Sequence, residues 1–110
     1  MAQPHARPGD VVDVRPLEAL LGDHVTTALF KSRQLEVIRL VLPRGKGLPQ
    51  HQVSGEITVQ CIEGLIDFSC GPRHQQLRPG QLIHLAAGEP HALHALEDSS
   101  ALLTLVLAGP

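Results

Sequence analysis

The chain has 110 residues, of which 43% are hydrophobic and 2% aromatic, and its formal charge at pH 7 is −2. A chain of this length buries roughly two-thirds of the surface that it exposes when unfolded, which is enough for one core. We therefore expect a single domain over residues 11–110, preceded by a flexible arm over residues 1–10, where two prolines occur without apolar periodicity. The near-neutral charge and the absence of Trp and Tyr argue against a nucleic-acid partner.

No segment approaches the ~18 uninterrupted apolar residues that a membrane span needs, and the N-terminus has no apolar leader. We expect a cytoplasmic protein without a membrane partner. Its two cysteines, Cys61 and Cys70, are interpreted as free thiols, because a chain long enough to build a core does not need a disulfide framework.

The first predicted element is a short helix over residues 16–21, with Pro16 at a favoured first helical position and Gly22 after its end. After it, glycine and proline recur at short intervals and leave apolar runs that are too short for helices. These runs predict strands over residues 25–30, 35–42, 56–62, 65–69, 75–77, 81–85, 92–96 and 101–107. Regular turn signals between short strands indicate an all-β sandwich or barrel.

Two of the predicted strands, residues 35–42 and 101–107, are apolar almost throughout. Such runs are typical of strands that are buried on both faces, and a second subunit is one way to cover the outer face. The sequence therefore predicts a homodimer, with residues 1–10 as a segment that could exchange between subunits.

Glycine, proline and histidine recur at fixed offsets in two segments, residues 45–64 and 80–95. Together these segments resemble the paired motifs of the cupin superfamily. The positions that match are Gly45, His51, Gly64, Gly80, Gly88 and His91. The resemblance implies a double-stranded β-helix, or jelly roll, in which inward-facing histidines hold a divalent metal near the mouth of the barrel.

The metal motif is degenerate in this chain. Val53 stands where the family has its second histidine, and Ile57 occupies the glutamate position, so that His51 and His91 are the family ligands that remain. A bound Fe, Mn, Ni, Zn or Cu ion would need a further donor, because two imidazoles leave its coordination incomplete.

Two residues are candidates for that third donor. Glu56 lies beside the expected position, but side chains alternate along a strand, so Glu56 reaches the site only if a bulge such as one at Gly55 turns it inward. Otherwise it is a solvated carboxylate. Cys70 would lie opposite Ile57 if residues 63–64 formed a two-residue hairpin turn; otherwise it is a small buried hydrophobe.

Two functions follow from this pattern. In the first, the barrel binds a small organic ligand without a complete metal site, in a pocket lined by His51, Val53, Ile57, Val59 and His91. The alternative is a divalent-metal-dependent cupin enzyme, such as a dioxygenase, isomerase or decarboxylase, that uses His51 and His91.

Overall fold

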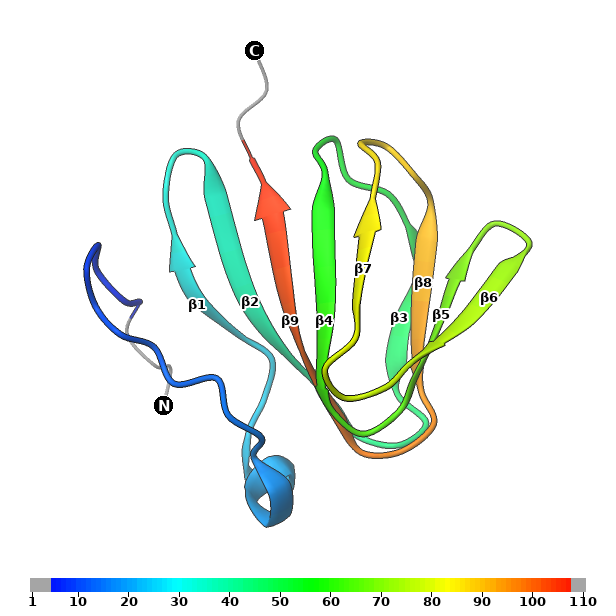
Figure 1. Cartoon of the computed structure of the whole chain (residues 1–110), viewed down its shortest axis with the longest axis horizontal. Helices are drawn as coiled ribbons and strands as arrows, with labels where there is room; N and C mark the ends of the chain where they lie inside the picture. Colours follow the sequence, from blue (N-terminus) through cyan, green and yellow to red (C-terminus); the bar gives the residue numbers. More distant parts are fainter. Residues whose placement is uncertain (1–4, 108–110) are drawn as a thin grey trace.

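The computed structural model describes residues 5–107, which form two antiparallel sheets packed face to face (Figure 1). A five-stranded sheet has the order β1-β2-β9-β4-β7, and a four-stranded sheet has the order β3-β8-β5-β6. The strands are β1 (Thr27–Lys31), β2 (Leu35–Leu42), β3 (Gly47–His51), β4 (Ile57–Glu63), β5 (Ile66–Cys70), β6 (Arg73–Leu77), β7 (Leu82–Leu85), β8 (His91–Ala95) and β9 (Ser99–Val106). The prediction of an all-β jelly roll is confirmed.

The core lies between the two sheets because apolar residues alternate along the strands. In β2, Leu40 points inward and lies opposite Ala101 of β9, whereas its neighbours Arg39 and Val41 face the other side of the sheet. The buried core comprises Leu40, Leu42, Ile57, Val59, Cys61, Ile66, Phe68, Leu77, Leu85, Leu93, Ala95 and Ala101. The barrel interior is therefore filled with side chains, as in other barrels of this size.

Strand β3 forms over a segment for which the sequence pattern predicts no strand. Its register against β8 shifts between Leu48, which lies opposite Leu93, and His51, which lies opposite His91. Three steps along β3 thus match two along β8, which is the signature of a bulge. Pro49 lies within this bulge, and the edge position of β3 in its sheet tolerates a residue without an N–H.

The hairpin across residues 63–64, which would bring Cys70 opposite Ile57, does not form. Gly64 does turn the chain, with a φ of 88° that favours glycine, but β4 and β5 then enter different sheets. In consequence Ile57 lies opposite Leu85 and Leu105, and Cys70 lies opposite Arg73. A Cβ at position 64 would lie 2.2 Å from Ser99 Oγ, so the turn packs too closely for any other residue.

The N-terminal segment, residues 10–24, contains a 3-10 helix over Glu18–Asp23, where a short helix was predicted. The helix begins two residues after Pro16, not at it. The amides of Leu17 and Glu18 each donate to the Glu63 carboxylate at 2.9 Å, and these tertiary bonds set where the helix begins.

The first four residues of the predicted arm lie outside the described residues. The part that follows lies beside β1 of its own chain, since the Ala6 amide donates to the Leu29 carbonyl at 2.8 Å. A local turn then closes from Arg7 to Asp10. Exchange of this arm between subunits stays a prediction.

Within residues 5–107, no helix is long and apolar enough to cross a membrane.

Candidate functional site

His51 and His91 meet at one end of the barrel. His51 is the last residue of β3 and His91 the first residue of β8, and their ring centroids are 4.3 Å apart. The loops that follow β3 and precede β8 lie at the same end of the molecule (Figure 1), and the Gly88 amide joins them by donating to the Val53 carbonyl at 2.9 Å. The cupin motif thus brings its two remaining histidines together.

The bulge in β3 explains how His51 reaches this position. Leu48 packs against the core, and in a regular strand a residue three positions later would point to the opposite face. The extra residue in the bulge reverses this alternation, so that His51 lies beside His91.

The two imidazoles have the same orientation toward their own backbone. Nδ1 of His51 lies 3.0 Å from the Pro49 carbonyl oxygen, and Nδ1 of His91 lies 3.0 Å from the Glu89 carbonyl oxygen. A carbonyl oxygen can only accept a hydrogen bond, so Nδ1 carries the proton in both rings. In a neutral imidazole Nε2 then keeps its lone pair and can act as a hydrogen-bond acceptor.

The two histidines differ in exposure. His91 is 3% exposed and stacks on Phe68 of β5, with ring centroids 5.8 Å apart and an interplanar angle of 7°. His51 is exposed. The pair therefore has one fixed, buried member and one member that solvent reaches, which suits a site at a barrel mouth.

The apolar residues expected to line the pocket lie at different depths. Val53 is partly exposed and packs against the edge of the core. Ile57 and Val59 are 3% and 1% exposed, because both belong to the packed interior. Direct contact of Ile57 and Val59 with a ligand stays a prediction.

Neither of the two candidate third donors lies in an environment that favours metal binding. Glu56 Oε1 lies 2.7 Å from His84 Nε2, and both side chains are largely exposed. Burial raises the pKa of the Cys70 thiol, and the nearby charge of Glu89 raises it further, which disfavours the thiolate that a metal requires. Among residues 5–107, no group of three or more His, Cys, Asp or Glu residues could hold a metal ion.

A second cluster of polar residues, Arg39 and Glu63 with Ser100, lies on the outer side of the five-stranded sheet, and the sequence analysis did not single it out. The buried Arg39 donates from Nη2 to the carbonyls of Val14 and Arg15. Ser100 Oγ donates to the Glu63 carboxylate. The signal in the sequence is one arginine within the apolar run of residues 35–42.

The environment of Glu63 favours its charged form. Burial acts to raise the pKa of this carboxyl group, but the hydrogen bonds from Ser100, Leu17 and Glu18 and the charge of Arg39 outweigh it, so that the pKa is lowered. Glu63 is therefore an ionised anchor for the N-terminal segment.

The jelly roll, with its two motif histidines at one mouth, defines a small protein of the cupin superfamily, and the comparisons with known proteins agree. Residues 43–107, more than half of the chain, match the AraC-like ligand binding domain. The chain belongs to this family. No curated relative matches it.

Several solved structures have the same fold. A conserved protein of unknown function from Streptococcus pyogenes is 23% identical with a TM-score of 0.76, covering 100% of this chain and 97% of its own. A cupin superfamily protein from Desulfitobacterium hafniense is 16% identical with a TM-score of 0.77, covering 94% and 100%. KdgF from a Halomonas species is 17% identical with a TM-score of 0.69, covering 76% and 80%. At these identities the likeness concerns the fold.

Proposed function

We propose that this protein binds a small hydroxylated organic molecule at the barrel mouth, with the Nε2 atoms of His51 and His91 accepting hydrogen bonds from it. The observation that supports this most directly is the hydrogen bond of each Nδ1 to a backbone carbonyl, which leaves both Nε2 atoms as acceptors on neighbouring rings. Such acceptors suit ligand hydroxyl groups or a protonated carboxyl group. The match to a ligand binding domain family supports the same function.

The residues at this mouth do not fit a resident metal ion. The fold family implies such an ion, and the orientation of the imidazoles would suit one. However, Glu56 is engaged with His84, and the raised pKa of Cys70 disfavours the thiolate form that binds metals. Two imidazoles do not complete the three or four protein ligands that Zn or Fe sites use.

The binding proposal is tested by amide NMR titration with a panel of polyols, monosaccharides and hydroxy acids. We expect saturable shifts at the amides of Phe68 and His91. Because one neutral hydrogen bond contributes about 0.5–1.5 kcal/mol, His51→Gln or His91→Gln should weaken binding roughly 2–10-fold. His94→Gln is the matched control, since His94 lies on the same strand but is exposed. Equal binding by all four proteins would refute the proposal.

The metal alternative is tested by elemental analysis of protein purified without a chelator or a histidine-rich tag, after incubation with Fe(II) and Zn(II). We expect substoichiometric metal in the natural protein and no change in a His51→Ala, His91→Ala variant. Near-stoichiometric metal that disappears in this variant would overturn the metal-free site and favour the cupin enzyme.

A further inference from the structure

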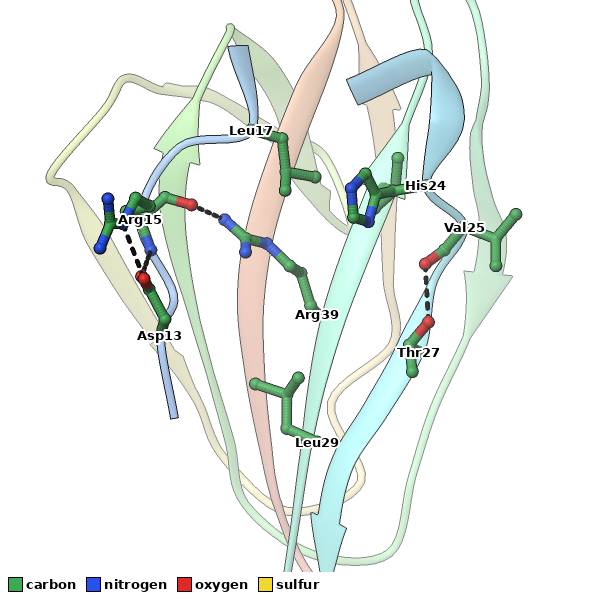
Figure 2. Close-up of a pocket in the computed structure, with 9 residues that line it drawn as sticks. Asp13, Arg15, Leu17, His24, Val25, Thr27, Leu29 and Arg39 are labelled. Atoms are coloured by element: carbon green, nitrogen blue, oxygen red, sulfur yellow. Dashed lines mark hydrogen bonds and ion pairs between the residues drawn. The ribbon is translucent and has the colours of Figure 1, made fainter. Parts of the chain in front are cut away.

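A cavity of about 230 Å³ lies outside the barrel. It opens to solvent and lies between the N-terminal segment and the side of β1 and β2 that faces away from the core (Figure 2). Leu17, Leu29 and Val41 form apolar parts of its wall. None of its lining residues belongs to the pair of motif histidines, so this cavity is separate from the barrel mouth.

The polar feature of this cavity is the guanidinium of Arg39. Arg39 is 9% exposed, and Figure 2 places its side chain between Leu17 and Leu29, with Arg15 on one side and His24 on the other. Its hydrogen bonds to described residues both leave from Nη2 and end on neutral backbone carbonyls. Nε is buried and has no hydrogen-bond partner within residues 5–107.

The charge of Arg39 has no ion-pair partner among the described residues. Two carboxylates, those of Asp13 and Glu63, lie close enough to interact with it electrostatically. Asp13 is paired with Arg15 at 2.7 Å. Glu63 accepts hydrogen bonds from two backbone amides and from Ser100. Burying a cation costs desolvation free energy unless an opposite charge pairs with it. Hydrogen bonds to neutral carbonyls offset this cost only in part.

We propose that this cavity binds a small carboxylate with a short apolar tail, whose carboxylate meets the guanidinium of Arg39. Guanidinium groups pair with carboxylates through charge-assisted hydrogen bonds. The walls carry two arginines against one aspartate, which leaves the lining positive. The apolar walls would hold the tail, and the volume suits a molecule smaller than a typical drug-sized ligand. An inorganic anion would leave the apolar walls without a partner.

The test uses amide NMR titration of the whole protein with sodium butyrate and hexanoate. We expect saturable shifts at Thr27, Leu29 and Arg39, with hexanoate binding more tightly than butyrate because its longer tail buries more apolar surface. Butyramide, which has the same shape without the charge, should bind at least about tenfold more weakly, since hydrogen bonds to charged groups are the stronger ones.

Two variants determine whether the shifts arise from binding in this cavity. Arg39→Gln should abolish the shifts, and Leu29→Phe, which fills the cavity while leaving Arg39 in place, should weaken them even if Arg39→Gln does not fold. The double variant His51→Gln, His91→Gln is the control and should bind butyrate normally. The proposal is overturned if butyramide or phosphate binds as well as butyrate, if Leu29→Phe has no effect, or if no saturable shift occurs.

Discussion

At the scale of single residues, Glu63 is one of the groups that hold the N-terminal segment on the sheet. It ends β4 and accepts hydrogen bonds from Leu17, Glu18 and Ser100. Because its folded-state pKa is lowered, the unfolded chain binds more protons in the interval between the folded and unfolded pKa values. The stability that Glu63 contributes is therefore present above the ordinary glutamate pKa and is lost as the pH falls through the lowered value.

We expect Glu63→Gln to lower the free energy of unfolding by about 1–3 kcal/mol at pH 7, because the amide cannot replace all the bonds that the carboxylate accepts. The difference from the natural protein should shrink as the pH falls below 4.5, the ordinary value for this group. Urea unfolding at pH 7 and at pH 3 measures both effects. Glu97→Gln, at an exposed position, is the control. An equal loss of stability at both pH values would show that the effect does not come from the ionised carboxylate of Glu63.

At the scale of elements, the edge strand β3 decides whether the two motif histidines meet. Gly47 lies opposite His94 of β8, and a Cβ on Gly47 would lie 2.0 Å from the Leu93 carbonyl oxygen. The two backbones approach so closely that only glycine fits without moving the strand.

Gly47→Ala should therefore displace β3 from β8 and separate His51 from His91, while the five-stranded sheet stays intact. We expect a loss of about 1–3 kcal/mol in unfolding free energy. Amide hydrogen exchange should show loss of protection in β3 and β8 and normal protection in β2 and β9. Gly22→Ala is the matched control, since a Cβ there finds nothing within 4 Å. Unchanged protection of β3 would show that the strand accommodates the methyl group.

At the scale of the whole molecule, the outer face of the five-stranded sheet is covered only in part. The N-terminal segment lies over the part near Arg39, and Leu21 of this segment is 4% exposed. Farther along, Leu35 and Val106 lie opposite each other with 38% and 40% exposure, and Leu82 is 60% exposed. Exposed large apolar side chains on an uncovered face of a sheet are found at interfaces.

We expect a second copy of the chain to cover this face, so that the protein sediments as a dimer at micromolar concentration. A charge at the centre of an apolar contact disfavours association, so Val106→Lys should shift the protein to a monomer without changing its circular dichroism spectrum. Lys31→Glu, at an exposed position of the neighbouring β1, controls for a change of charge alone. A natural protein that sediments as a monomer would contradict the prediction.

The class of fold and the identity of the motif histidines could be predicted from the residues alone. Short apolar runs between glycine and proline specify strands and turns locally, so most strands lie where they were predicted, and residues 35–42 form β2 with the same bounds. The offsets of the cupin motif identified His51 and His91, which lie together at the barrel mouth.

How these elements combine depends on contacts between distant parts of the chain. The bulge in β3 depends on pairing with β8, which follows 40 residues later in the chain, and the placement of β4 and β5 in different sheets depends on which partners bury their inner faces. The contacts of Arg39 with Val14 and of Glu63 with Leu17 join residues that are 25 and 46 positions apart. Local sequence patterns do not predict such pairings, because the free energy of these contacts arises only when distant segments are buried together.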